Sequence, residues 1–445
     1  MNISSMDDPI FERIRKRIPL FWENPDRHKA ALTLPTLPLG REDIEDAERR
    51  LHRFAPVISE LFPETKPRKG VIESELIDAV PLAREISACY DTPLPGRYFI
   101  KADHALPVAG SVKARGGIYE VLWFAEDIAL KHGIITETDS YLTLLSNDAK
   151  KLFSDHTLSV GSTGNLGVSI GVTGAALGFH TQVHMSADAK PWKKAQLRSR
   201  GVDVIEYGGD YSAAVAAGRK GVQDNPRAHF VDDEDSKLLF LGYSVAALRL
   251  LTQLQEQDIV VDDNHPLFFW LPCGVGGAPG GITFGLQHVL GDPARCFFCE
   301  PVDAPAFLVG MLTNFEGGVS VYDVGLTNKT AADGLAVGTP SILVGRLVKH
   351  LVSGSVTVTD EDLFRFVELA HRSMGLKLEP SATAGCMGPL LLHSSPEGRG
   401  YLEAVLGRTP PESSTHITWT TGGSLVPEDE FSDYLAAGER LCETV

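Results

Sequence analysis

Positive charge is scarce in this sequence of 445 residues. Lysine and arginine together number 41 against 58 aspartate and glutamate residues, which gives a formal net charge of −17 at pH 7. A protein that binds a nucleic-acid backbone or an anionic membrane surface needs a basic patch to do so. We therefore expect neither a nucleic acid nor a membrane among its partners.

The sequence also lacks a long uninterrupted apolar run. Its first residues, MNISSMDDPIFERIRKRI, contain no hydrophobic core of a secretory signal, so we expect no secretory leader. Residues 156–187 and 266–286 carry no Asp, Glu, Lys or Arg and are long enough to span a bilayer, but Gly, Pro, Ser, Thr and Asn interrupt both. We expect two buried strand–loop–helix units there, in a cytoplasmic protein.

Cysteine is rare as well, with only six residues in the chain. Cys296 and Cys299 form a single C-x-x-C pattern in the aromatic context RCFFCE. A zinc ribbon would need a second pair, although a metal or redox role for this pair stays open as the alternative. We expect buried structural thiols of the kind found in a reducing compartment.

Glycine is what the sequence has in excess, with 43 residues, twelve of them in the two uncharged stretches. Short β-rich segments alternate with Gly-punctuated helical segments from about residue 96, which predicts mostly parallel sheets covered by helices on both faces. We predict strands at 97–102, 140–145, 157–160, 181–185, 202–206, 267–271 and 296–299. We predict helices at 8–19, 41–62, 117–130, 165–177, 191–199, 238–256 and 281–290.

The motif GSVKARGG at 110–117 places Lys113 at a transition from loop to helix, with Ser111 available as the helix N-cap. A lysine that acts as a Schiff-base nucleophile needs access to a carbonyl carbon and a neutral amine. The alternative from this string alone is a solvated lysine on a helix face.

A second motif, VGSTGNLG at 160–167, follows a predicted strand. Ser162, Thr163 and Asn165 would present two hydroxyls and an amide at a helix N-terminus, which favours an anionic or polar ligand. A helix cap with a glycine turn is the alternative.

The third motif, LPCGVGGAPGGI, connects the apolar strand at 267–271 to a helix. Its glycines allow successive backbone N–H groups to converge on one anion at the helix N-terminus. It is neither a Walker A loop nor a dinucleotide fingerprint, so it predicts a phosphate cup, with a plain turn as the alternative. The cup would consist of Gly274, Val275, Gly276, Gly277, Gly280 and Gly281.

Together the three motifs resemble those of the fold type II pyridoxal-phosphate enzymes, and within them the D-serine dehydratase family. The resemblance extends over about residues 97–430 through strings such as FVDDEDS, LFLGYSVA, AADGLAVG, LEPSA and TGGSLVP. It implies a fold of two open, mostly parallel twisted sheets flanked by helices. It also implies a large pyridoxal 5′-phosphate-binding domain (1–150 and 236–445, with an N-terminal extension over about 1–95) and an inserted substrate-closing domain at 151–235.

The resemblance also implies a role for each motif. Lys113 would hold the cofactor covalently and take the substrate Cα proton, and the glycine cup would bind the cofactor phosphate. Asn165 would bind the ring hydroxyl oxygen, and Thr421 would face the pyridine nitrogen as a neutral partner. Ser162 and Thr163 would face the substrate carboxylate, and Asp233 would line the substrate site.

A cation site is implied at Glu300, which occupies a ligand position for a monovalent cation such as K⁺ in related dehydratases. The chain departs from the family pattern at Ala278, where a glycine is usual, and at Ala306, where some relatives supply an acidic cation ligand.

The expected activity is the conversion of D-serine to pyruvate and ammonia, and of D-threonine to 2-oxobutanoate, by a monomer or homodimer. An L-serine/threonine dehydratase and a D-cysteine desulfhydrase of the same fold are the alternatives. A non-enzymatic ligand sensor would have lost Lys113 or Asn165, and both are present.

Overall fold

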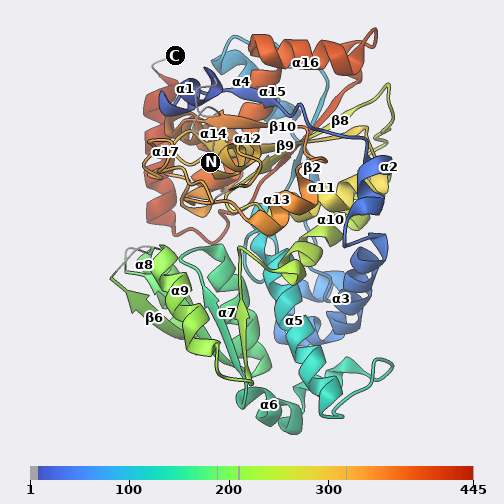
Figure 1. Cartoon of the computed structure of the whole chain (residues 1–445), viewed down its shortest axis with the longest axis vertical. Coiled ribbons are helices and arrows are strands. Elements are labelled where there is room, and N and C mark those ends of the chain that lie inside the picture. Colours follow the sequence, from blue (N-terminus) through green and yellow to red (C-terminus); the bar gives the residue numbers. More distant parts are fainter. Residues whose placement is uncertain (1–8, 188, 209–210, 317, 444–445) are drawn as a thin grey trace. The chain divides into compact units, whose positions relative to one another are not determined.

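The computed structural model describes residues 9–187, 189–208, 211–316 and 318–443 (Figure 1). These residues form two compact units. The first unit comprises the described residues of Met1–Arg41, Ser74–Ala105 and Ala246–Val445, and the second those of Glu42–Glu73 and Leu106–Val245. The division by role into a cofactor-binding and a substrate-closing domain stays a prediction.

A seven-stranded sheet with the order β1-β10-β9-β8-β11-β3-β2 forms the centre of the first unit. The five inner strands are parallel, and the two edge strands run antiparallel to their neighbours. The strands are β1 (Phe21–Glu23), β2 (Leu76–Asp78), β3 (Arg97–Lys101), β8 (Leu267–Pro272), β9 (Ala294–Pro301), β10 (Gly354–Val358) and β11 (Thr415–Trp419).

The helices of this unit separate the parallel strands, as crossover connections require. They are α1 (Pro9–Arg15), α2 (Ala30–Thr33), α4 (Val80–Cys89), α11 (Gly277–Leu290), α12 (Ala306–Leu312), α13 (Ile342–Val348), α14 (Asp360–Met374), α15 (Met387–Ser394), α16 (Pro396–Leu406) and α17 (Glu428–Cys442). Short 3-10 helices span Leu34–Thr36, Asp103–Ala105, Asp333–Leu335, Pro380–Cys386 and Pro411–Ser413.

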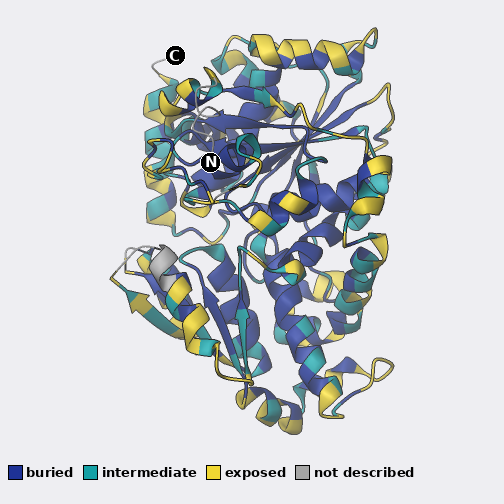
Figure 2. Cartoon of the chain, in the orientation of Figure 1, coloured by how far each residue is buried: buried dark blue, intermediate teal, exposed yellow. Residues whose placement is uncertain are grey.

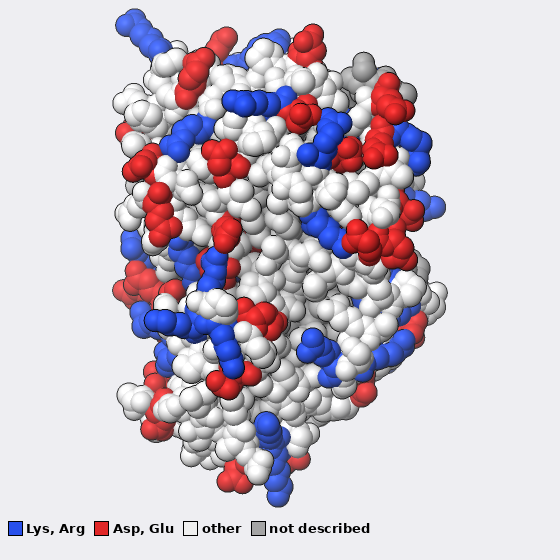
Figure 3. All heavy atoms as spheres, turned by 180° about the vertical axis from the view of Figure 1, so that it is seen from behind, with Lys and Arg blue, Asp and Glu red and all other residues white. Residues whose placement is uncertain are grey.

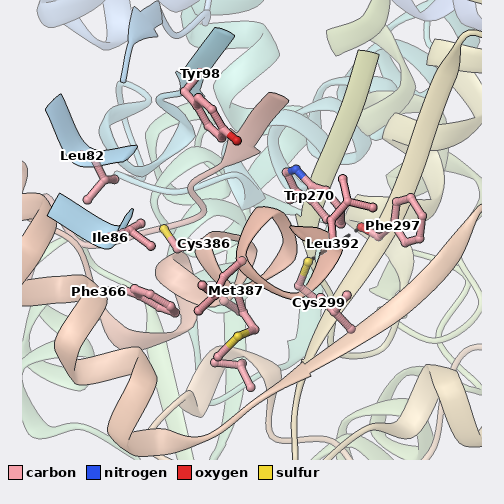
Figure 4. Close-up of a cluster of buried hydrophobic side chains, with 14 of the residues drawn as sticks. Leu82, Ile86, Tyr98, Trp270, Phe297, Cys299, Phe366, Cys386, Met387 and Leu392 are labelled. Carbon is pink, nitrogen blue, oxygen red and sulfur yellow. Dashed lines mark hydrogen bonds between the residues drawn. The ribbon is translucent and has the colours of Figure 1, made fainter. Parts of the chain in front are cut away.

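The core of the first unit lies around the central strand β8, whose residues are all buried. An unbroken apolar run suits a strand of a parallel sheet with both faces covered. Trp270 of β8 stacks on Phe297 of β9 with ring centroids 4.9 Å apart. Figure 4 shows these rings together with Leu82 and Phe366 in one buried apolar cluster.

The second unit contains an all-parallel sheet of four strands with the order β6-β5-β4-β7. Its strands are β4 (Thr157–Gly161), β5 (His180–Ser186), β6 (Asp203–Tyr207) and β7 (Ala228–Val231). Strands β4 and β7 are buried or half-buried throughout, whereas the edge strand β6 exposes Asp203 and Glu206 (Figure 2). The helices are α3 (Arg41–Leu61), α5 (Lys113–Lys131), α6 (Asn147–Ser154), α7 (Asn165–Leu177), α8 (Pro191–Ser199) and α9 (Tyr211–Val222), with 3-10 helices at Pro63–Arg68 and Tyr141–Leu145. Helix α10 (Lys237–Glu256) continues from the second unit into the first.

Two mostly parallel sheets within α/β units confirm the fold class expected from the sequence. One predicted element is wrong, because residues 140–145 form the 3-10 helix Tyr141–Leu145 instead of a strand. Tyr141 and Leu144 are buried while the residues between them are exposed, and this spacing of three suits a 3-10 turn.

Among the described residues, α10 alone is long and apolar enough by length and composition to cross a membrane, and 61% of its apolar window is buried inside the protein. A buried core helix meets the same criterion. On the face drawn in Figure 3, Lys and Arg side chains lie among Asp and Glu side chains.

The thiols of Cys273, Cys296, Cys299 and Cys386 are buried, and those of Cys89 and Cys442 are half-buried. Cys296 and Cys299 are three residues apart on strand β9, so their side chains point to opposite faces of the sheet. No group of three or more His, Cys, Asp or Glu side chains in the described part of the chain is placed to hold a metal ion. The pair therefore does not form a shared metal site there.

Candidate functional site

The glycine motif forms the turn between β8 and α11 in the first unit. Gly276 caps the helix with φ +110°, a left-handed conformation that favours glycine. A Cβ at this position would lie 2.7 Å from the Phe307 ring, and a Cβ at Gly274 would lie 3.1 Å from Leu335 Cα. The turn is therefore packed closely against neighbouring side chains and backbone, which leave no room for a Cβ at Gly276 and little room for one at Gly274.

Two backbone hydrogen bonds hold this turn in place. Cys273 N donates to Cys299 O at 2.9 Å, and Ser341 N donates to Val275 O at 2.9 Å. Ser341 is itself the N-cap of α13, and its hydroxyl accepts from Val344 N. The loop that leads into α11 is thus fixed to β9 on one side and to α13 on the other.

The start of α11 offers backbone donors to an anion, because the first N–H groups of a helix have no partner within the helix. Gly277 and Ala278 are its first two residues. Gly280 N already donates to Gly276 O at 2.8 Å, and Gly281 lies further inside the helix. In the predicted cup, Gly280 and Gly281 can allow an anion to approach the helix closely. The backbone N–H donors come from the residues before them.

Thr421 follows strand β11, which is the direct neighbour of β8 in the sheet. The glycine turn and Thr421 therefore lie at the carboxyl ends of adjacent parallel strands, where ligands bind in open α/β sheets. Thr421 is half-buried, and its neighbour Thr420 is buried.

A buried histidine that the sequence reading missed lies beside Thr420. The Thr420 hydroxyl donates to Lys101 O at 3.1 Å and lies 2.7 Å from His104 Nδ1. Because the single hydroxyl proton goes to Lys101 O, His104 Nδ1–H donates to the threonine oxygen. Burial lowers the pKa of His104 to about 4, so the ring is neutral at pH 7.

Glu300 lies at the end of β9 and is fully buried. Its carboxylate accepts from Phe307 N at 2.7 Å, from Leu308 N at 3.0 Å and from Ser355 Oγ at 2.9 Å. Burial raises the pKa of Glu300 to about 8, although these three hydrogen bonds act in the opposite direction. The observed role of this carboxylate is to cap α12 and tie it to β10.

Lys113 is the first residue of α5 in the second unit. Its Nζ lies 3.2 Å from Asp233 Oδ2 and 3.3 Å from Asp233 Oδ1, so the structure brings these two predicted residues together. The Lys113 side chain is 21% exposed and the Asp233 side chain 10% exposed. The Lys113 side chain is half-buried and paired with a carboxylate, which argues against the alternative of a solvated lysine on a helix face.

The N-cap of α5 differs from the expectation. Val112 occupies the cap position, and no side chain caps the helix. Ser111 is buried, and its hydroxyl has no hydrogen-bond partner among the described residues. The local sequence suggested a cap because serine is a good N-cap residue, but the helix begins one residue later than such a cap requires.

The glycines that follow Lys113 allow helices to approach α5 closely. A Cβ on Gly116 would lie 2.6 Å from the Tyr243 ring of α10, and a Cβ on Gly117 would lie 2.2 Å from Ser169 Oγ of α7. Tyr243 is fully buried, and Lys113 Nζ lies 5.9 Å from its ring centroid. Sequence periodicity did not identify this tyrosine, since a buried aromatic residue on α10 is indistinguishable from ordinary core.

Ser162, Thr163 and Asn165 lie in the turn between β4 and α7, and Asn165 is the first residue of α7. Ser162 is buried, and its hydroxyl accepts from Gly164 N at 3.3 Å. Strand β7, which leads to Asp233, is the neighbour of β4. Ser162, Thr163, Asn165 and Asp233 therefore follow the carboxyl ends of adjacent parallel strands.

Comparison with known proteins identifies a family that matches this chain. Residues 79–400 match the family described as "Pyridoxal-phosphate dependent enzyme". A protein of Halalkalibacterium halodurans named "Probable D-serine dehydratase" is 49% identical over 431 residues, which cover 97% of this chain and 97% of that protein. A Chromobacterium violaceum protein of the same name is 51% identical over 421 residues and 94% of each chain.

Solved structures of low sequence identity share the fold. Diaminopropionate ammonia lyase from Escherichia coli, in a complex with D-serine, has a TM-score of 0.69 and 15% identity over 95% of this chain and 98% of that chain. A fungal L-serine ammonia-lyase from Rhizomucor miehei has a TM-score of 0.58 and 20% identity over 82% of this chain and 97% of that chain. The predicted fold type II resemblance is confirmed.

Proposed function

The chain belongs to the pyridoxal-phosphate-dependent enzyme family, and on that premise we propose that it is a lyase that converts D-serine to pyruvate and ammonia. The observation that carries the proposal is the identity of about half of all residues to probable D-serine dehydratases along nearly the whole chain. In the reaction the Cα–H and Cβ–O bonds of D-serine break and one water leaves. Hydrolysis of the resulting imine then breaks the Cα–N bond with one water and gives pyruvate and ammonia, so the water balance is zero.

The residues present fit a phosphorylated cofactor that reacts with an amine. The turn before α11 has no room for a Cβ at Gly276 and precedes a helix of 14 residues, which suits a phosphate group. The hydroxyl of Ser111, two residues before Lys113, is buried without a partner among the described residues, which is the state expected of a group that awaits a ligand.

Pyridoxal 5′-phosphate, when bound, supplies the conjugated ring that accepts the electron pair from the substrate Cα. Lys113 is proposed to hold it covalently and then, as a free amine, to take the Cα proton. Asp233 is proposed to hold that amine in place through the 3.2 Å contact and to line the substrate site.

The remaining predicted residues are proposed to bind and orient. Ser162 and Thr163 would donate hydroxyl hydrogen bonds to the substrate carboxylate, and Asn165 would donate its amide to the ring oxygen of the cofactor. Thr421 would face the pyridine nitrogen without charge. A carboxylate at that position would protonate the nitrogen, so a hydroxyl favours elimination over transamination.

Three further features belong to the proposal. A monovalent cation such as K⁺ would bind at Glu300, where it competes with the three hydrogen bonds that the carboxylate already accepts. The protein would act in the cytoplasm as a monomer or homodimer. D-threonine would be a second substrate.

The test uses purified protein loaded with pyridoxal 5′-phosphate. Pyruvate release is measured with D-serine, L-serine and D-cysteine, 2-oxobutanoate release with D-threonine, and the visible absorption of the bound cofactor is recorded. Lys113→Ala should abolish pyruvate release and the absorption of the covalently held cofactor. The matched control is Lys131→Ala on the same helix, whose exposed side chain pairs with Asp127. Higher kcat/KM on L-serine or D-cysteine, or normal turnover by Lys113→Ala, would contradict the proposal.

A further inference from the structure

Two side chains of helix α5 contact the same segment of the chain. Lys113 and Glu120 are seven residues apart, which is close to two helical turns, so they lie on the same side of the helix. Lys113 contacts Asp233, and Glu120 contacts both His229 and Ser236. We call residues 229–236, which comprise the last three residues of β7 and the turn that leads to α10, the acidic loop.

Glu120 binds both ends of the acidic loop. Its Oε1 lies 2.8 Å from His229 Nε2, and its Oε2 accepts from Ser236 Oγ at 2.5 Å. Ser236 Oγ also accepts from Leu239 N at 3.0 Å, so its single proton goes to the carboxylate. A carboxylate of this kind only accepts, which makes His229 Nε2 the donor. Glu120 itself is 2% exposed.

The middle of the acidic loop is a tight turn. Asp235 N donates to Asp232 O at 3.2 Å, and Glu234 N donates to Asp232 Oδ1 at 3.1 Å. Arg219 Nη2 lies 2.6 Å from Asp232 Oδ2. Four consecutive carboxylates repel one another, so the conformation that directs Asp233 to Lys113 needs support from outside the turn.

We propose that Glu120 is a positioning residue that fixes the two ends of the acidic loop and thereby holds the Asp233 carboxylate against the Lys113 amine. A buried carboxylate is costly unless its oxygens are hydrogen-bonded, and both oxygens of Glu120 are bonded to this loop. The inference rests on the proposed function, because it takes Lys113 as the reacting amine.

A matched control lies six residues further along α5. Glu126 is 3% exposed and accepts from Arg50, Arg53 and Tyr141, none of which belongs to the acidic loop. Truncation of either glutamate removes a buried carboxylate from the same helix. Only the truncation of Glu120 releases the acidic loop.

The first experiment compares Glu120→Ala with Glu126→Ala in the full-length holoenzyme. Glu120→Ala should lower kcat on D-serine between about tenfold and a hundredfold, the range expected for a misplaced catalytic group, whereas Glu126→Ala should leave kcat near the wild-type value. Amide hydrogen exchange, followed by mass spectrometry, should become faster at residues 229–236 in the Glu120 variant and not in the Glu126 variant. Equal effects of the two variants on kcat and on exchange would overturn the proposal.

A second experiment keeps the proposal testable if Glu120→Ala does not fold. Gln can present an N–H donor where His229 Nε2 lies, so His229→Gln should retain wild-type exchange in the acidic loop and kcat, whereas His229→Leu should lose both. Combining His229→Leu with Asp233→Asn should lower kcat no further than Asp233→Asn alone, because His229 and Glu120 act through Asp233. A double variant whose loss of kcat is the product of the two single losses would contradict the proposal. Equal kcat and equal exchange in the two His229 variants would also contradict it.

The two proposals fail in different ways. If the wild-type protein does not release pyruvate from D-serine, the proposed function fails. The exchange comparison between the Glu120 and Glu126 variants still decides whether Glu120 holds the acidic loop, because it does not depend on turnover.

Discussion

Replacement of Gly276 by alanine tests the turn before α11 most directly. The position has φ +110°, and the new methyl group would lie 2.7 Å from two carbons of the Phe307 ring. The left-handed backbone alone costs a non-glycine residue about 1–2 kcal/mol. Overpacking against a buried ring adds about 1–3 kcal/mol. We therefore expect Gly276→Ala to lower the free energy of unfolding by roughly 2–5 kcal/mol.

A second glycine separates the two contributions. Gly375, the C-cap of α14, has φ +66°, and a Cβ there would meet nothing within 4 Å. Gly375→Ala should therefore cost only the backbone contribution of about 1–2 kcal/mol. Urea denaturation of both variants, without added cofactor, measures the difference. Equal destabilisation of the two variants would show that Phe307 moves aside and that the turn is not closely packed against it.

The same variants test the phosphate cup. Gly276→Ala should weaken the binding of pyridoxal 5′-phosphate about 10-fold to 100-fold, since the loss of one hydrogen bond to a charged group costs about 1.5–3 kcal/mol. Gly375→Ala should leave the affinity unchanged. A fluorescence titration of the apoprotein gives both dissociation constants. Unchanged affinity of the Gly276 variant would refute the assignment of this turn to the phosphate.

Two further predictions concern buried polar groups. The pKa of Glu300 is raised to about 8 in the folded protein, so the folded state holds this proton more tightly than the unfolded state. Its contribution to stability is complete below about pH 4.5 and declines by about 3–5 kcal/mol as the pH rises through 8, as a shift of this size implies. Glu300→Gln should flatten this decline in urea denaturation at pH 6 and pH 8.5, and an identical decline in both proteins would assign it to other groups. The Tyr243 hydroxyl is buried without a hydrogen-bond partner among the described residues. Tyr243→Phe should therefore leave the free energy of unfolding unchanged or raise it by about 1 kcal/mol. Thermal denaturation measures the change, and a loss of stability would show that the hydroxyl is hydrogen-bonded.

Much of the fold could be predicted from local patterns. The apolar run of β8 and the glycine turn after it arise from local sequence, and the strand lies where the pattern indicates. The helix begins at Gly277, four residues before its predicted start. The segment at 140–145 shows the limit of such reasoning. Its sequence is compatible with a short strand and with a 3-10 turn whose buried residues are three positions apart. Only tertiary packing decides between these two structures.

The site residues divide in the same way. Lys113 could be proposed because its motif, together with two other motifs, resembles a known family. The partners of Glu120 could not be identified, because they lie 109 and 116 positions away in the sequence. The partner of His104 could not be identified either, because it lies 316 positions away. No periodicity in one sequence encodes which buried acid meets which donor, so these contacts became visible only in the folded chain.

The two edge strands of the first unit have a consequence for shortened forms of the protein. β1 and β2 come from the residues before β3, and they occupy the outer sides of β10 and β3. A chain that lacks these residues would present both flanks of a long parallel sheet as unpaired rows of N–H and C=O groups. Such rows are templates for strand addition by other chains. A truncated protein should therefore polymerise or precipitate through its sheet edges, even where its catalytic residues are intact.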